Sequence, residues 1–433
     1  MLKRLPAIRP SRRFMGLGLA ALVISVIAIM FGEGTRSIAL IAWALLGAVA
    51  FIDLILSRAG KRTLDVAPIP ELFVGETQDI DITITPAPMA LSARIDWPEG
   101  LRGPSEILFD DGHARIPVDT VRRGIWEIAS IWLFWPSRFG LFEMVPRLPL
   151  GLEVSVVPNI RLVQSGAITS QVLSTLYGVK ENRAIGEGSE FHQLRDFVRG
   201  MDVKSIDWKR SARYRQLVAK ELRAERNHHI IIAFDNGYLM REEIAGLPKI
   251  DHAVTAGLAT AWAAAIGGDL VGFYAYDARP RIFVKPEPGR IAFNHLRTRT
   301  AELSYVTQET NHTLALSELN ARTPKRSLIV VFSDFVDTTT AELLVENVSI
   351  LAKRHVIIFV AIRDPNMDAM VEDAPDTMDD VAELVAVGQT LKERRAVFDR
   401  LARLGVMVID ARPGTLTPQL ISTYLEIKAR ELI

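Results

Sequence analysis

Two long apolar stretches near the start of the chain constrain its fold more than any other feature. Residues 14–31 contain no charged side chain, and residues 38–56 contain only Asp53. Each stretch is close to the ~20 residues that a helix needs to cross the core of a bilayer. The connection between them is long enough only for a turn. We therefore predict that residues 1–62 form a membrane anchor with two transmembrane helices.

The charges around these stretches predict the orientation of the anchor. Residues 1–62 contain nine Lys and Arg residues and two acids, and the bases cluster before the first stretch and after the second. Cytoplasmic flanks of membrane helices are enriched in such bases. We expect both ends of this multi-pass hairpin, and with them the bulk of the chain, to lie in the cytoplasm. We expect Asp53 to reach the membrane interface or pair with Arg58, and a functional carboxylate inside the membrane is the alternative.

The composition excludes several classes of protein. The 433 residues carry no net charge and no cysteine, and 49% of them are hydrophobic. Without cysteine the chain has no disulfide framework and no thiolate metal site. Because the anchor holds an excess of positive charge, the remaining residues are mildly acidic. That charge argues against a nucleic-acid partner, which requires a basic surface.

The remaining residues divide by pattern into three further segments. Residues 63–158 contain short alternating runs such as 79–85, punctuated by Pro and Gly, which is typical of a small β-sandwich. In residues 227–433, uninterrupted apolar strands alternate with helices, which predicts a doubly wound, mostly parallel sheet. Residues 159–226 read as a linker. The predicted fold class is therefore a multidomain α+β protein with a membrane hairpin.

The linker contains the most distinctive motif of the chain, a segment at residues 187–213 that we call the signature segment. It mixes acids, bases and large aromatic side chains with no single period. Arg pairs carboxylates through two parallel hydrogen bonds, so such a mixture is typical of an ion-pair network. We expect a partly buried clasp, and a surface that docks a partner is the alternative. The residues singled out are Glu190, Phe191, Arg195, Gly200, Asp202, Asp207, Trp208, Ser211 and Arg213.

These residues carry a resemblance to a bacterial family known as domain of unknown function 58 (DUF58). The segment matches the family's pattern of Gly-x-Glu-Phe, Leu-Arg, Gly-x-Asp, Ile-Asp-Trp and Ser-Ala-Arg, with a one-residue departure at Met201. A second patch, Arg122-Arg123-Gly124 followed by Pro136 and Phe139-Gly140-Leu141, also resembles the family. The resemblance implies a protein of the bacterial inner membrane that works with a MoxR-type AAA+ ATPase, with a client that stays unidentified.

The C-terminal segment resembles a von Willebrand factor type A domain, a fold that binds Mg²⁺ through a Ser-rich first loop, a Thr and an Asp. The resemblance assigns Asp235, Thr313 and Asp334 to these positions, but Gly237 and Leu239 stand where the first loop has Ser. Mg²⁺ prefers six hard oxygen ligands. We therefore expect a degenerate site in which Mg²⁺ binding is weak or lost, and in which bases or backbone amides hold the carboxylates.

The sequence therefore predicts a non-enzymatic adaptor or scaffold. The alternatives are a metal-dependent phosphoester hydrolase that uses Asp235 and Asp334, and a purely structural membrane scaffold. No nucleophile–base pair and no phosphate-binding loop is apparent in the sequence. The hydrolase therefore has less support than the adaptor.

Overall fold

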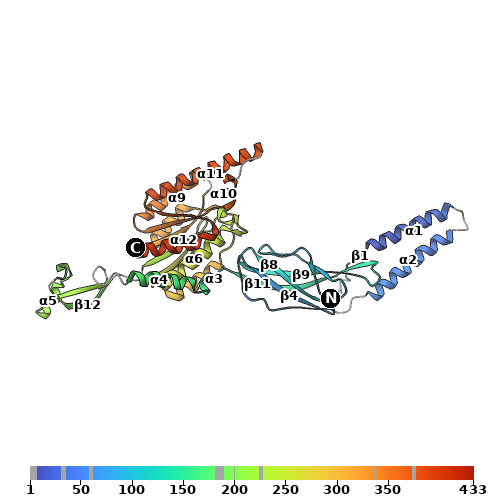
Figure 1. The fold of residues 1–433 in the computed structure, drawn as a ribbon, viewed down its shortest axis with the longest axis horizontal. Helices are drawn as coiled ribbons and strands as arrows, with labels where there is room; N and C mark the ends of the chain where they lie inside the picture. Colours follow the sequence, from blue (N-terminus) through green and yellow to red (C-terminus); the bar gives the residue numbers. More distant parts are fainter. Residues whose placement is uncertain are drawn as a thin grey trace. The chain divides into compact units, whose positions relative to one another are not determined.

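The computed structural model forms two compact units, residues 1–157 and 158–433 (Figure 1). It describes residues 7–30, 36–57, 62–180, 190–198, 200–223, 228–335, 338–372 and 377–433. The predicted turn at 32–35, Arg58, and Glu187 and Gly188 of the signature segment lie outside the described residues. Each unit is described by itself below.

The first unit begins with the predicted helical hairpin. α1 spans Arg12–Met30 and α2 spans Arg36–Leu56, and the two helices pack side by side. Both are long and apolar enough to cross a membrane, and nearly all their side chains face outward. The hairpin marks the chain as a membrane protein.

The rest of this unit is the predicted sandwich of two sheets. One sheet has the order β2-β4-β8-β6, with bounds Thr63–Val66, Thr77–Thr85, His113–Thr120 and Leu101–Arg102. The other has the order β1-β10-β9-β11-β3, with bounds Ala7–Pro10, Phe142–Val145, Gly124–Pro136, Arg147–Val157 and Leu72–Phe73, and β5 (Ser92–Ile95) and β7 (Ile107–Leu108) attached. Exposed and buried residues alternate strictly along β8, as a half-buried strand requires.

The hairpin is tied to the sandwich at both of its ends. β1 precedes α1 and pairs with β10, so that Ala7 lies opposite Val145. At the other end, Asp53 of α2 is fully buried and accepts hydrogen bonds from Ser137 Oγ at 2.5 Å and from Phe139 N at 2.8 Å. The sequence missed this contact, because nothing in the pattern of α2 indicates that a sandwich loop packs against it.

The second unit contains the predicted α/β domain, and its sheet confirms the predicted fold class. The strand order is β18-β17-β14-β19-β20-β21, and all neighbours are parallel except β18 and β17. The strands span Pro280–Pro288, Leu270–Tyr276, His229–Asp235, Ser327–Phe332, Val356–Ile362 and Met407–Ala411. The four central strands, β17, β14, β19 and β20, are buried almost throughout, which explains their continuous apolar runs.

Helices pack on this sheet in two groups. α6 (Lys249–Ile266) contacts α7 (Gly289–Ala301) and α12 (Pro413–Ala429). α9 (Thr338–Ala352) contacts α8 (His312–Arg322) and α11 (Met378–Arg403), and α10 (Pro365–Glu372) packs on α11. The segment predicted as a linker is not all linker: α3 (Arg161–Gln164) and α4 (Ala167–Lys180) pack against α6.

Candidate functional site

The two predicted carboxylates lie at the carboxyl edge of the sheet, where the parallel strands end. Asp235 is the last residue of β14, and Asp334 follows the neighbouring strand β19 by two residues. Ligands of open α/β sheets bind at this edge. The structure therefore brings together two of the three predicted metal ligands.

Neutral hydrogen-bond donors surround Asp235, which is buried. Oδ1 accepts from Gly237 N at 2.9 Å and from Thr310 Oγ1 at 2.5 Å. Oδ2 accepts from Ser333 Oγ at 2.6 Å. Each of these bonds stabilises the carboxylate without neutralising its charge.

The second-loop residue at this site is Thr310, and the prediction of Thr313 is corrected. Thr313 is exposed and accepts a hydrogen bond from Asn347 Nδ2 at 3.0 Å. The Thr310 hydroxyl also explains the lost serine of the first loop, because a Cβ at Gly237 would lie 1.9 Å from Thr310 Oγ1. The loop has several Thr residues, and spacing alone does not distinguish them.

Two cations hold Asp334, which is also buried. Its Oδ2 lies 2.6 Å from Lys249 Nζ, and its Oδ1 lies 2.6 Å from Arg394 Nη1. Burial alone would raise the pKa of Asp334, but Arg394 and Lys249 together keep that pKa below its usual value. Burial would likewise lower the pKa of Lys249, but Asp334 and Glu242 keep it above its usual value. Asp334 and Lys249 are therefore both ionised at neutral pH.

These pairs belong to a longer row of alternating charges that we call the ion-pair row. Its members, in order, are Glu242, Lys249, Asp334, Arg394, Asp410, Arg363, Asp368 and Arg412. Beyond Arg394, the contacts are 3.2 Å to Asp410 and then 2.7 Å from Asp410 to Arg363. The row crosses the ends of β19, β20 and β21. Sequence reasoning identified only Asp334, because its partners come from separate helices and strands.

Two buried polar groups lie beside Asp235 without a hydrogen-bond partner in the described part of the chain. They are the Tyr276 hydroxyl and Nδ1 of His312. His312 Nε2 lies 3.9 Å from Asp235 Oδ2. Burial lowers the pKa of His312 more than Asp235 raises it, so the ring is neutral at pH 7. Within the described part of the chain Nδ1 of His312 has no hydrogen-bond partner, and the Ser333 hydroxyl donates to Asp235 Oδ2.

The residues at this edge do not fit a divalent cation. Asp235 is a single carboxylate that already accepts three hydrogen bonds, and both oxygens of Asp334 are bound to cations. Among the described residues, no group of three His, Cys, Asp or Glu could hold a metal ion. A hard cation prefers several free oxygen ligands and is repelled by adjacent positive charges.

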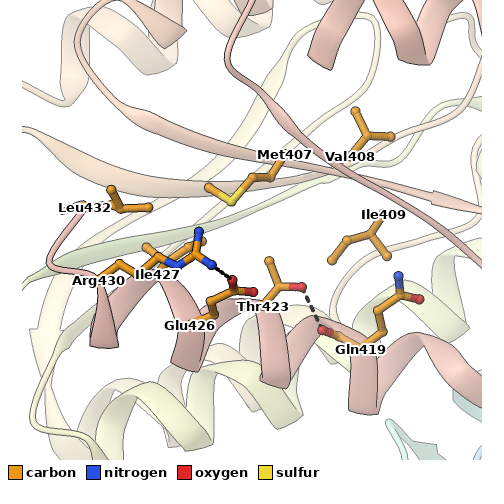
Figure 2. Close-up of a pocket in the computed structure, with 9 residues that line it drawn as sticks. All are labelled: Met407, Val408, Ile409, Gln419, Thr423, Glu426, Ile427, Arg430 and Leu432. Atoms are coloured by element: carbon orange, nitrogen blue, oxygen red, sulfur yellow. Dashed lines mark hydrogen bonds and ion pairs between the residues drawn. The ribbon is translucent and has the colours of Figure 1, made fainter. Parts of the chain in front are cut away.

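A cavity of about 310 Å³ lies elsewhere on the α/β unit, between β21 and α12 (Figure 2). It is lined by Met407, Val408, Ile409, Gln419, Thr423, Glu426, Ile427, Arg430 and Leu432. Its two charged groups, Glu426 and Arg430, pair with each other at 2.5 Å. Met407 starts β21, so the cavity opens near the amino end of this edge strand, and its lining offers no unpaired charge for chemistry.

The signature segment forms a small two-stranded element that we call the signature hairpin (residues 190–223). β12 (Glu190–Asp196) pairs with β13 (Val218–Arg223), and α5 (Trp208–Tyr214) lies between them in sequence. Asp207 caps α5 by accepting from Arg210 N at 3.1 Å, and this bond lowers its pKa. Buried Ser211 accepts from Val218 N at 2.9 Å. The signature residues therefore form caps and turns.

Two more signature residues set the turn before α5. Asp202 accepts from Lys204 N at 2.9 Å, and Gly200 has φ of +104°, a conformation that other residues rarely adopt. The backbone of Glu190 and Phe191 lies in β12, but their side chains lie outside the described part. Arg195 and Arg213 are exposed.

The exposure of the signature hairpin contradicts the clasp prediction. Trp208 and Tyr214 are each 64% exposed, and Val203 is 62% exposed. Bases outnumber acids on its described side chains: Arg195, Lys204, Lys209, Arg210, Arg213, Arg215 and Lys220 against Asp196, Asp202 and Asp207. Asp207 contacts Lys220 at 3.5 Å, and the side chains of Arg195 and Arg213 are exposed. Instead of a buried clasp, Asp202 and Asp207 accept hydrogen bonds from nearby backbone amides, and the rings of Trp208 and Tyr214 are exposed.

Comparisons with solved structures find distant similarity. BatB from Bacteroides thetaiotaomicron is 15% identical and has a TM-score of 0.33, with 47% of this chain and all of that chain covered. Proximal thread matrix protein 1 from the mussel byssus, with a zinc-occupied MIDAS motif, is 9% identical with a TM-score of 0.29, and 47% and 46% of the two chains are covered. An uncharacterized membrane spanning protein from Vibrio fischeri is 13% identical with a TM-score of 0.17, and 47% and 98% are covered.

The family comparison agrees with the resemblance carried by the signature segment. No curated protein matches the chain. A family model described as "Protein of unknown function DUF58" matches residues 193–404, which run from the signature hairpin to the end of α11. Residues 193–404 of this chain therefore match the DUF58 family, as the resemblance of the signature segment implied.

Proposed function

We propose that this protein is a membrane-anchored, non-enzymatic adaptor that binds protein partners through the signature hairpin. The membrane helices and the match to the DUF58 family model support an adaptor or scaffold in general terms. The observation that carries the proposal is the exposed apolar surface of the hairpin. Soluble surfaces rarely expose several large apolar side chains together unless they bind a partner.

The chemistry of this surface indicates the kind of partner. Its exposed apolar side chains are Val198, Val203, Trp208, Tyr214 and Leu217. Trp, Tyr and Arg are the residues that most often dominate protein interfaces. Because bases outnumber acids on the described side chains of the same hairpin, we expect the complementary surface to be acidic with an apolar centre.

We further propose that the partner is a MoxR-type AAA+ ATPase, as the family resemblance implies. The adaptor would be a multi-pass protein of the bacterial inner membrane, with the sandwich and the α/β unit in the cytoplasm. Its role would be ATPase-assisted maturation or assembly of membrane or envelope proteins.

The hydrolase alternative has little support at the carboxyl edge. A metal-dependent hydrolase needs carboxylates that are free to bind metal. Asp334 is bound to Lys249 and Arg394 instead, and Asp235 accepts three neutral donors. A purely structural scaffold stays the second candidate, and an ATPase partner distinguishes it from the adaptor.

The test is capture of a MoxR-type ATPase from the same organism by the full chain in detergent. The double variant Trp208→Ala/Tyr214→Ala removes two exposed rings without touching the caps of α5. We expect the ATPase to bind the unmodified chain and binding by the variant to fall by at least about tenfold, the equivalent of about 1.4 kcal/mol.

The matched control is Met89→Ala/Ile291→Ala, which removes exposed apolar side chains from outside the hairpin. It should leave capture unchanged. If the unmodified chain captures no ATPase, the structural scaffold is favoured. If both double variants bind like the unmodified chain, the signature hairpin is not the docking surface.

A further inference from the structure

Lys249 is placed at the carboxyl edge by a tight hairpin. β15 (Glu243–Ile244) pairs with β16 (Leu247–Pro248), and Lys249 follows as the first residue of α6. The register sets Glu242 opposite Lys249, and Lys249 N donates to the Glu242 carbonyl at 2.9 Å. The turn uses Ala245 and Gly246, both with positive φ, as two-residue hairpins require.

The ammonium group lies between two carboxylates. Nζ is 2.6 Å from Asp334 Oδ2 and also donates to Glu242 Oε2. The Lys249 side chain is 8% exposed, whereas that of Glu242 is 53% exposed. Carboxylate oxygens surround bound divalent cations at similar distances, about 2.0–2.6 Å. Nζ therefore occupies a position that a divalent cation with the same two ligands would take.

We propose that the Lys249 ammonium is a built-in substitute for a divalent cation at the carboxyl edge. It occupies the position between Asp334 and Glu242 permanently, so the carboxylates stay ionised and ordered without metal. Removing it creates a divalent-cation site there. The proposal does not depend on the adaptor function.

Charge balance supports this assignment. A divalent ion added beside Lys249 would meet the ammonium at contact distance and Arg394 on the far side of the same carboxylate. Repulsion between such charges is strong where little water screens them. When the ammonium is absent, Asp334 keeps only Arg394, and Glu242 has lost the cation that it contacts. The carboxylates of Asp334 and Glu242 then face the position that the ammonium has left.

The test compares Mn²⁺ binding by the unmodified chain and by Lys249→Ala, both full length in detergent, using electron paramagnetic resonance and thermal melting. We expect no saturable site in the unmodified chain and one site in the variant. At about 100 times its dissociation constant, Mn²⁺ should raise the melting temperature of the variant by roughly 5–10 °C. The double variant Lys249→Ala/Glu242→Gln should show no such rise in melting temperature with Mn²⁺, because one of the two ligands is then neutral.

Lys428→Ala is the matched control. Lys428 is half-buried, and its Nζ lies 2.7 Å from Asp269, but no second carboxylate among the described residues contacts it. This variant should gain no Mn²⁺ site. A folded Lys249→Ala protein without a Mn²⁺ site would overturn the proposal. A saturable Mn²⁺ site in the unmodified chain that is removed by Glu242→Gln or Asp235→Asn would also overturn the proposal. This second measurement does not require Lys249→Ala to fold.

Discussion

At the scale of single residues, the carboxyl edge is organised by pairing rather than by free reactive groups. Arg394 shows this most clearly, because it contacts Asp334 at 2.6 Å and Asp410 at 3.2 Å and is 14% exposed. Burial alone would lower its pKa, but the two carboxylates raise it. A buried charge of this kind is costly unless it is paired. The stability of this edge therefore depends on both partners being present.

Replacement of this arginine tests that dependence. Arg394→Leu keeps apolar contact with Phe335 and Phe398 but leaves Asp334 with one cation fewer. Breaking a buried pair from one side costs about 3–5 kcal/mol, and we expect that loss in the free energy of unfolding of the α/β unit by denaturant titration. Arg400→Leu is the control, because Arg400 is 48% exposed and pairs with exposed Glu342. It should change stability by no more than about 0.5 kcal/mol. If Arg394→Leu and Arg400→Leu changed the free energy of unfolding equally, the ion-pair row would not stabilise this edge as we propose.

At the scale of elements, regular periodicity in the sequence predicted the strands well, but it did not predict contacts between elements that are distant in sequence. The apolar runs that end in Asp235 and Asp334 predicted their strands, because burial on both faces leaves a continuous signal. We predicted a linker where α3 and α4 lie, because their packing on α6 leaves no recognisable pattern in their own sequence. Thr310 and Lys249 were missed for the same reason, since three-dimensional neighbours decide their roles.

The contact between α2 and the sandwich can be tested directly. Asp53 accepts from Ser137 Oγ and Phe139 N, and Ser57 Oγ on the next turn accepts from Arg138 N at 2.8 Å. The loop that makes these contacts contains Phe139-Gly140-Leu141, part of the second family-like patch. This part of the patch therefore lies at the junction between the hairpin and the sandwich.

Loss of the Asp53 carboxylate should loosen this junction. Asp53→Ala leaves buried donors unsatisfied, which costs about 1–3 kcal/mol, and should speed proteolysis of the sandwich in detergent. Asp53→Asn keeps one acceptor oxygen, so its rate of proteolysis should lie between those of Asp53→Ala and the unmodified chain. Asp79→Ala, at an exposed position in β4, should have no effect. Unchanged proteolysis of Asp53→Ala would show that β1 and β10 alone hold the junction.

At the scale of the whole molecule, the first unit fixes the two ends of the hairpin on one side. β1 lies before α1 and β10 lies after α2, yet they pair in one sheet. A sheet that holds both ends requires the chain to cross the membrane an even number of times if it crosses at all. The bases at both ends favour the cytoplasmic side. The proposed partnership with a cytoplasmic ATPase requires this orientation.

Labelling of single cysteines tests this topology, because the natural chain has none and every label reports the introduced residue. Ser37→Cys, at the start of α2, should react with a membrane-impermeant maleimide added to cells whose outer membrane alone is permeabilised. Met89→Cys, in the 89% exposed position of the sandwich, should react only after the inner membrane is opened as well. If Met89→Cys is labelled from the periplasm and Ser37→Cys is protected, the orientation is reversed. Cytoplasmic ATP would then be out of reach of both units, and the proposed ATPase partnership would fail together with the topology.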